Sequence, residues 1–184
     1  DLTVDGAGKG NTNSSMFGVA FRNAGGEINN VTIKDVRDTP LSGNQHGVGA
    51  YSYNDDGIGR TIKLLDSTIV GFQKNATAFN ASATTPLVLD IERNTITGAG
   101  VTAITAQNGI QTSAPLGSGT IANNTISGIA YDGSGWVATG ILDFYTNLNI
   151  TGNTMSVCHT CIYTIGTPAT ISNNTLSVIK AGGY

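Results

Sequence analysis

One short motif, an asparagine and a threonine followed by an apolar residue and a small polar one, occurs four times in the second half of the chain. It reads RNTITG at residues 93–98, NNTISG at 123–128, GNTMSV at 152–157 and NNTLSV at 173–178. Recurrence at a fixed interval of some tens of residues is typical of chains that stack one structural unit on the next. The motif therefore directs attention to a repeat along the whole chain.

Groups of the form apolar, polar, apolar carry the same period from one end of the chain to the other. Their last residues fall at 4, 33, 64, 91, 121, 150 and 171, at intervals of 29, 31, 27, 30, 29 and 21 residues. A second set of apolar residues has intervals of 29, 31, 31, 31 and 21: Val19, Val48, Phe79, Ile110, Ile141 and Ile162. Short alternating stretches indicate strands, because successive side chains of a strand point to opposite faces.

Equivalent strands about 30 residues apart pack most economically as a solenoid, in which each coil lies parallel to the previous one at about 4.8 Å. We therefore predict an all-β fold, a parallel β-helix of about six coils that forms a single domain over residues 1–184. The N-T-[IVLM]-[ST]-G ends and the glycine-isoleucine second strands resemble the pectate-lyase-like superfamily of right-handed parallel β-helices, from Leu2 to about Ile179. The resemblance implies a right-handed coil and a secreted protein, and it admits polysaccharide lyases and glycoside hydrolases among the functions.

Composition excludes several other classes of function. Only 11% of the residues are charged and the formal net charge is −3, so the basic surface that binds nucleic acid is lacking. The sequence contains no run of 18 apolar residues, so no membrane span is predicted. Asp1 is not an initiator residue, so the chain is expected to be a processed protein or a piece of a longer one. We expect it to act outside the cell or at the cell surface.

Two cysteines, Cys158 and Cys161, form a CHTC sequence near the end of the chain. In an oxidising compartment they are disulfide candidates, and otherwise they are plain buried thiols. A zinc site is not predicted, because it needs a second pair of ligands and the chain has two histidines, His46 and His159. No cofactor is expected, apart from Ca²⁺ if the chain is a lyase.

The asparagines of the repeated motif occupy one position per coil. Counting three residues from each apolar anchor gives five successive positions: Ser67, Asn94, Asn124, Asn153 and Asn174. Stacked amides can pass hydrogen bonds along the axis, and asparagine tolerates the left-handed backbone of a sharp corner. A structural ladder explains the spacing better than catalysis, because no reactive residue repeats with the asparagines.

Seven asparagines begin an N-x-[ST] sequence and are candidates for N-glycosylation. They are Asn13, Asn30, Asn75, Asn80, Asn123, Asn149 and Asn173. In a chain this rich in asparagine, serine and threonine, many such matches arise by chance.

The polar residue of each apolar, polar, apolar group should face outward in one column, which contains Lys63 and Asp90, with Glu92 and Arg93 beside it. In enzymes of the resembled superfamily the catalytic residues lie on such an outer face. A lysine and carboxylates there could serve a lyase as base and cation ligands. The alternative is an exposed ion pair between neighbouring strands, which contributes little.

A second acidic candidate is the loop YNDDGIGR at residues 53–60, in which Asp55 and Asp56 resemble the acidic elements of polygalacturonases, with Gln45-His46-Gly47 as a fainter counterpart. The order of these elements is reversed here, and the Arg-Ile-Lys element of that family is absent. Inverting glycosidases need two separated carboxyl groups. Adjacent aspartates in a loop also serve as a plain turn.

Aromatic residues gather around residues 131–145, where Tyr131, Trp136 and Tyr145 are candidates for carbohydrate binding. Exposed rings beside an aspartate suit a sugar platform, and they equally suit contact with another chain or the covering of a loop. Asp143 should point inward, level with Thr112 and Thr164, unless a corner turns it out.

We predict no amphipathic capping segment near either end of the given sequence, and open solenoid ends can stack on copies of the same protein. The first functional hypothesis is therefore an extracellular structural protein that assembles end to end into a filament or forms part of a longer surface fibre. The second is a polysaccharide-active enzyme. The third is a glycan-binding module without catalysis, and in either of the last two cases a polysaccharide is the partner.

Overall fold

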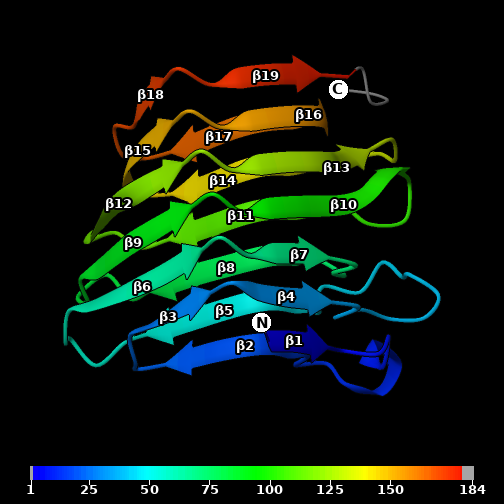
Figure 1. Ribbon diagram of the computed structural model, residues 1–184, viewed down its shortest axis with the longest axis horizontal. Coiled ribbons are helices and arrows are strands. Elements are labelled where there is room, and N and C mark those ends of the chain that lie inside the picture. The colour runs from blue at the N-terminus through cyan, green and yellow to red at the C-terminus, as the bar shows by residue number, and fades with distance from the viewer. Residues whose placement is uncertain (1, 180–184) are drawn as a thin grey trace.

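The chain folds into a parallel β-solenoid, which a computed structural model describes for residues 2–179 (Figure 1). Three parallel sheets run along its axis, and strands from successive coils lie side by side in each sheet. The predicted all-β solenoid is confirmed, and it makes about five turns where the sequence suggested about six. Within the described residues, no helix is long and apolar enough to cross a membrane.

The first sheet has seven strands in the order β1-β4-β7-β10-β13-β16-β19. Its strands are β1 (Leu2–Asp5), β4 (Val31–Lys34), β7 (Thr68–Val70), β10 (Thr95–Thr102), β13 (Thr125–Tyr131), β16 (Thr154–Cys158) and β19 (Thr175–Val178). We call it sheet A. A short 3₁₀ turn, η1 (Gly10–Thr12), follows its first strand.

The other two sheets have six strands each, and we call them sheets B and C. Sheet B contains β2 (Phe17–Arg22), β5 (Val48–Asn54), β8 (Asn75–Ala81), β11 (Asn108–Ser113), β14 (Thr139–Phe144) and β17 (Thr160–Ile165). Sheet C contains β3 (Gly26–Asn29), β6 (Arg60–Leu65), β9 (Leu87–Glu92), β12 (Gly117–Ala122), β15 (Asn147–Thr151) and β18 (Thr170–Ser172). Each coil runs through sheets A, B and C in turn.

The strand register corrects the column inferred from the apolar, polar, apolar groups. Val4 and Ile33 pair with each other in sheet A, whereas Leu64 and Ile91 pair in sheet C, where their partner in the first coil is Ile28. The early and late anchors therefore belong to different sheets. The assignment failed because Val31-Thr32-Ile33 and Ile62-Lys63-Leu64 have the same pattern, and alternation reveals a strand without revealing its sheet.

The second set of apolar anchors is also displaced in part. Ile110, Ile141 and Ile162 pair in register as expected, but Val19 pairs with Ala50, and Phe79 pairs with Thr112. Val48 and Phe79 each lie two residues from the common position. A shift of two keeps a side chain on the same face of a strand, so apolar spacing alone does not detect it.

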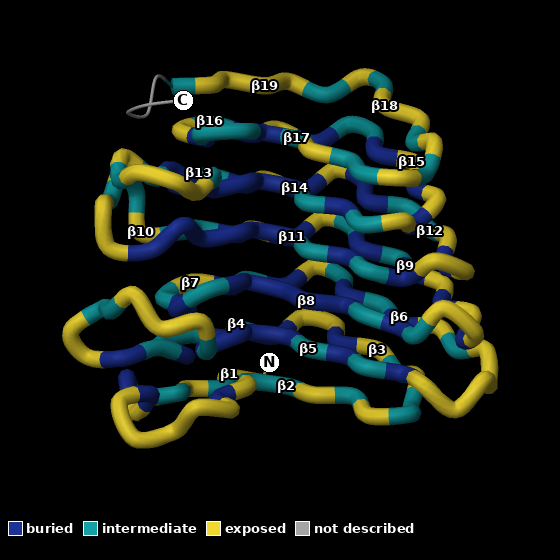
Figure 2. The backbone as a smooth tube through the Cα atoms, turned by 180° about the vertical axis from the view of Figure 1, so that it is seen from behind, coloured by how far each residue is buried: buried dark blue, intermediate teal, exposed yellow. Residues whose placement is uncertain are grey.

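The core fills the space between the three sheets, where the dark segments of Figure 2 mark the buried backbone. Isoleucine and leucine dominate it, and side chains such as Ile62, Ile91 and Ile121 have no exposed surface. Asp143 is also fully buried, as its alternation predicted. It accepts hydrogen bonds from Thr112 Oγ1 (2.7 Å) and from the Thr146 amide (3.1 Å), while burial raises its pKa.

The asparagine column forms a continuous ladder at the corner between sheets C and A. Asn124 Oδ1 accepts from the backbone N–H and from Nδ2 of Asn94, both at 2.9 Å, and Asn124 Nδ2 donates to Asn153 Oδ1 at 2.9 Å. The same amide nitrogen also donates to the Ile91 carbonyl oxygen at 2.9 Å. Asn153 repeats this arrangement with Asn174, and the Ser67 amide donates to Asn94 Oδ1 at 3.0 Å.

The sharp corner is made by the residue before each ladder asparagine, which corrects the expectation that the asparagines themselves adopt the left-handed backbone. Left-handed φ angles of 48°, 57°, 56°, 68° and 55° occur at Asp66, Arg93, Asn123, Gly152 and Asn173. The ladder residue is thereby turned inward, where its amide reaches both neighbouring coils. This division explains why the residue before the asparagine varies while the asparagine recurs.

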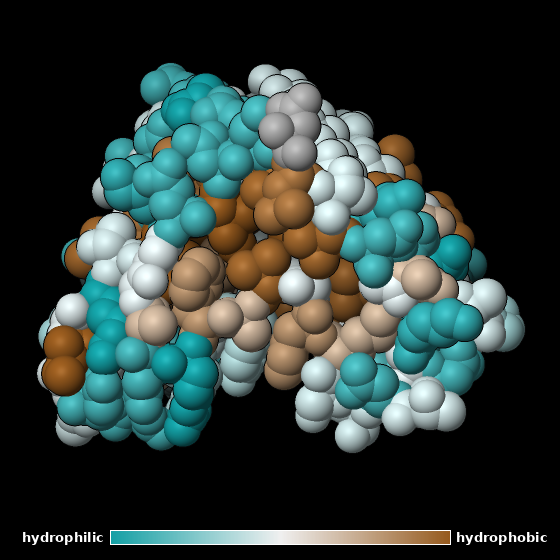
Figure 3. Space-filling view, turned by 60° about the horizontal axis from the view of Figure 1, so that its bottom comes forward, coloured by the Kyte–Doolittle hydropathy of each residue, from teal (hydrophilic) through white to brown (hydrophobic). Residues whose placement is uncertain are grey.

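The two ends of the solenoid expose apolar side chains. Strands β1 and β19 are the edges of sheet A in the described part of the chain, and Leu2 and Val178 are 59% and 62% exposed. Leu176 and Ile171 are also exposed at the last coil. Figure 3, with the end at the first coil turned forward, shows a central apolar area enclosed by polar surface.

Removing one rung of the ladder should destabilise the fold strongly. Asn124→Ala leaves the Ile91 carbonyl and the Asn94 N–H without their partners, so we expect a loss of about 3 kcal/mol, because buried unsatisfied polar groups cost about 1–3 kcal/mol each. Urea unfolding followed by circular dichroism measures it. Asn149→Ala, which removes an exposed asparagine from β15, is the matched control and should change stability by less than about 0.5 kcal/mol. Equal effects of the two substitutions would contradict the ladder's role.

Candidate functional site: an aromatic groove beside sheet B

Two of the loops between sheets A and B border a groove. Residues 35–47 connect β4 to β5 and project from one edge of the solenoid (Figure 1), and residues 132–138 connect β13 to β14. Between them, residues 71–74 connect β7 to β8 by a short corner. Residues 103–107, which connect β10 to β11, also lie between them, and Lys74, Thr105 and Ala106 from these two shorter connections line the groove.

The groove consists of two adjoining cavities that share Gln45, Lys74 and Trp136. The first cavity, of about 330 Å³, lies among the loops and is also lined by Tyr131 and Thr105. The second, of about 530 Å³, continues over the outer face of sheet B. Its further lining residues include Asn108, Gln111, Leu142, Phe144 and Tyr163.

Trp136 provides the largest apolar surface of the groove, since it is 72% exposed. It is the single tryptophan of the chain. Tyr131 belongs to the same cavity and packs in part against the core. Two of the three aromatic candidates from the sequence therefore lie together, whereas Tyr145 does not line either cavity and contacts the corner at Gly166.

A cluster of amides lies at the floor of the second cavity. Asn108 Nδ2 donates to Asn75 Oδ1 at 3.1 Å and to Gln111 Oε1 at 3.2 Å. Asn108 is only 4% exposed, and its Oδ1 has no hydrogen-bond partner in the described part of the chain. Thr105 Oγ1, which belongs to the first cavity, is likewise buried and without a partner. Buried polar atoms are almost always paired. Of the nine unpartnered side-chain atoms among the described residues, these two belong to residues that line the groove.

Lys74 lies where the two cavities meet. Its backbone is held from both sides, by its own N–H donating to the Gly47 carbonyl and by its carbonyl accepting from the Asn108 N–H. Its Nζ donates to the Ala106 carbonyl, and burial lowers the pKa of the ammonium group. Among the described residues no carboxylate forms an ion pair with it.

The wall formed by residues 35–47 is held in place by a buried carboxylate. Asp38 has no exposed surface, and it accepts hydrogen bonds from Ser42 Oγ and from Asn44 Nδ2. His46 Nε2 lies 2.7 Å from Asp38 Oδ1. The bond from Ser42 is the main reason that the pKa of Asp38 lies below its usual range. The network fixes the loop that carries Gln45 into the groove.

Sequence reasoning did not find Lys74, Asn108 or Tyr163 as members of a site, and it considered Gln45 only as part of the Gln45-His46-Gly47 segment. Asn75 and Asn108 pair in register on neighbouring strands, and each follows a corner. The recurrence of asparagine at this position is the one weak signal that the sequence contained. Lys74 stands alone in the sequence without a charged partner, so no motif marked it. Only the packing of four different coils brings these residues together.

The charged column lies elsewhere, on the outer face of sheet C. Lys63 pairs in register with Asp90 and, on its other side, with Glu27, which the sequence had not placed in this column. Arg93 is bound to Asp66 through Nε (2.8 Å) and to Glu92 through Nη1 (2.5 Å). Asp66 raises the pKa of the Arg93 guanidinium. Arg93 therefore forms exposed ion pairs with Asp66 and Glu92, whereas no ion pair joins Lys63 to Asp90 or to Glu27 among the described residues.

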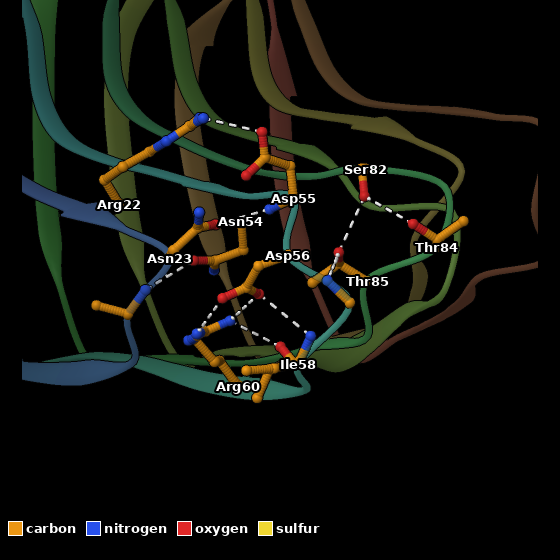
Figure 4. A network of polar contacts seen from close by, with 12 residues as sticks. Arg22, Asn23, Asn54, Asp55, Asp56, Ile58, Arg60, Ser82, Thr84 and Thr85 are labelled. Atoms are coloured by element: carbon orange, nitrogen blue, oxygen red, sulfur yellow. Dashed lines mark hydrogen bonds and ion pairs between the residues drawn. The ribbon is translucent and has the colours of Figure 1, made fainter.

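The two loop aspartates are each held by an arginine (Figure 4). Asp55 binds Arg22 at 2.8 Å, and Asp56 forms a two-pronged contact with Arg60, with both N–O distances at 2.6 Å. Hydrogen bonding to Arg60 lowers the pKa of Asp56 to about 2. A carboxyl that is ionised at neutral pH and occupied by an arginine is poorly suited to donate a proton. Neither aspartate lines the groove.

Possible metal ligands in the part of the chain that the structure describes do not form a cluster. No group of three or more histidine, cysteine, aspartate or glutamate side chains could hold an ion there. The Ca²⁺ considered for a lyase would need several converging oxygens. Glu92 and Asp90, the acids proposed for it, both belong to strand β9 of sheet C.

Cys158 and Cys161 are free, buried thiols, and no disulfide joins them in this structure. Their side chains are directed into the core of the last coils, and they interact with each other. Burial raises the pKa of Cys158 to about 12 and also raises that of Cys161. Both side chains serve as core residues here.

The glycosylation candidates separate by exposure. Five of them are exposed: Asn13, Asn30, Asn123, Asn149 and Asn173. Asn80 is half-buried, whereas Asn75 is 6% exposed and hydrogen-bonded to Asn108 in the groove. Asn75 is therefore unsuitable as an acceptor in the folded protein.

Comparisons with protein-family models, with curated proteins and with solved structures find no match for this chain. The structure establishes the parallel β-solenoid, and membership of the pectate-lyase-like superfamily stays a prediction. The groove must consequently be interpreted from its own geometry.

The two thiols should be almost unreactive in the folded protein. With its pKa raised to about 12, Cys158 at pH 8 carries roughly a thousandth of the thiolate of a free cysteine, and thiolate is the reactive form. Labelling with a dye that reacts by disulfide exchange should therefore be slow in the native protein and faster as the pH rises. After denaturation it should reach two thiols per chain. Rapid labelling of the native chain, or a mass two hydrogens lighter without reductant, would contradict the assignment.

Proposed function

We propose that the protein is a glycan-binding β-solenoid that holds a saccharide in the groove beside sheet B. The observation that carries the proposal is the exposed Trp136 ring above a cavity whose floor contains amides and unpartnered buried oxygen atoms. Sugar rings combine an apolar face with a rim of hydroxyl groups, so they match an aromatic platform beside amide donors and acceptors. Activity outside the cell or at its surface belongs to the same proposal.

Binding is favoured over cleavage because of where the acidic groups lie. The loop aspartates are paired with arginines, and the charged column belongs to sheet C, where none of its residues lines the groove. Glycoside hydrolysis requires a pair of carboxyl groups across the scissile bond. Neither cavity has an acidic residue among its described lining residues.

Substitution of the tryptophan tests the proposal. Trp136→Ala should weaken glycan binding at least about tenfold, because an aromatic anchor at the centre of a site contributes most of the affinity. A glycan array followed by calorimetry with the strongest ligand measures the effect. Tyr145→Ala is the matched control, since Tyr145 is 47% exposed but lies outside both cavities. Unchanged binding by Trp136→Ala would show that the glycan does not bind in the groove. An equal loss of affinity in both variants would indicate a binding surface that extends beyond the groove.

A second candidate function, end-to-end assembly, rests on the apolar ends. The inward column of sheet A starts at Val4 and finishes at Leu176, so a second copy stacked on the last coil would continue it. Leu176, Val178 and Ile171 form part of an apolar depression there. Association through different faces of the same molecule extends into an open filament. Such a filament would display the groove once per copy along its side.

Blocking one end should abolish this assembly. Val178→Lys places a charge on the exposed edge strand, where it would be desolvated on stacking, so the variant should stay monomeric. Val88→Lys is the matched control, because Val88 is 45% exposed on the lateral face of sheet C. Sedimentation over a range of concentrations should give a rising mass for the native chain and the control. A native chain that stays monomeric throughout would remove this second candidate.

A further inference from the structure

Lys74 is the one charged residue among the described residues that line the two cavities. It is a half-buried cation with its backbone fixed between neighbouring coils, and it lies where the cavities meet. Other cations of the chain, such as Arg22, Arg60 and Arg93, are paired with carboxylates. A desolvated cation without an anionic partner costs free energy, which an anion supplied by a ligand would recover.

We propose that the groove selects saccharides that carry an anionic group, a carboxylate or a sulfate ester, and that Lys74 binds this group. The inference rests on the proposed glycan-binding function and specifies the class of ligand. The sugar ring lies against Trp136, and the anionic substituent points to the Lys74 ammonium between the cavities. The amide groups of Asn108 and Gln111 bond the hydroxyl groups of the same or the adjoining residue.

The arrangement accounts for several features together. Lys74 Nζ uses one of its three donors on the Ala106 carbonyl, which leaves two for a ligand. Asn108 Oδ1 lacks a donor, and sugar hydroxyl groups are donors as well as acceptors. Gln45, from the wall held by Asp38, belongs to both cavities and can contact either part of the ligand. The groove therefore offers a cation, acceptors and an aromatic face within one connected space.

The test uses an array in which each saccharide backbone occurs in neutral, uronate and sulfated forms. The best backbone is then titrated in solution at about 0.15 M salt, where long-range attraction between exposed charges is screened. The fluorescence of Trp136, the single tryptophan, reports occupancy of the groove itself. Comparison of the uronate and sulfated forms shows which anionic group the site prefers.

We expect an anionic form to bind about ten times more tightly than its neutral counterpart, as a charge-assisted hydrogen bond provides. Lys74→Gln should remove this preference, so that the anionic and neutral forms bind this variant with equal affinity. Lys74→Met, which keeps the apolar stem, should do the same, and Lys74→Arg should retain the preference. Lys9→Gln, which removes an exposed lysine outside the groove, controls for the loss of one positive charge.

The outcomes separate this inference from the function on which it rests. If neutral and anionic forms bind equally, or if Lys74→Gln and Lys74→Met keep the preference, Lys74 does not select anions, while glycan binding itself stands. If no saccharide on the array changes the fluorescence of Trp136, the proposed function fails, and the anion preference fails with it.

Discussion

Hydrogen bonding between successive coils is the interaction on which the rest of the structure depends. Each strand is satisfied by strands of the coils before and after it, so no coil is stable alone. The ladder of Asn94, Asn124, Asn153 and Asn174 carries this bonding through the corner between sheets C and A, where strand pairing stops. It thereby sets the register in which the apolar columns of the core stack.

This constraint divides the molecule into parts that repeat and parts that are free to vary. The corner between sheets C and A is nearly invariant, because the ladder requires the same backbone turn in every coil. The connections between sheets A and B carry no such ladder, and they range from the single residue His159 to the long segment 35–47. Unequal loops over a regular sheet produce a groove, and the groove collects the aromatic ring, the amides and the lysine.

The fold was largely predictable from the sequence, and the site only in part. Apolar periodicity and the recurring asparagines were sufficient for a parallel solenoid, because both follow from stacking. They could not separate sheet A from sheet C, since Val31-Thr32-Ile33 and Ile62-Lys63-Leu64 look alike. Trp136 and Tyr131 were visible as aromatic residues in a loop. Lys74 and Asn108 were not recognisable in the sequence, because their contacts come from coils about 30 residues away in either direction.

A crystal structure with a bound oligosaccharide that carries uronate or sulfate groups would test the account most directly. The account predicts a sugar ring stacked on Trp136, an anionic oxygen within hydrogen-bonding distance of Lys74 Nζ, and a hydroxyl group donating to Asn108 Oδ1. A saccharide bound instead along the charged face of sheet C, or in the loop of Asp55 and Asp56, would contradict it.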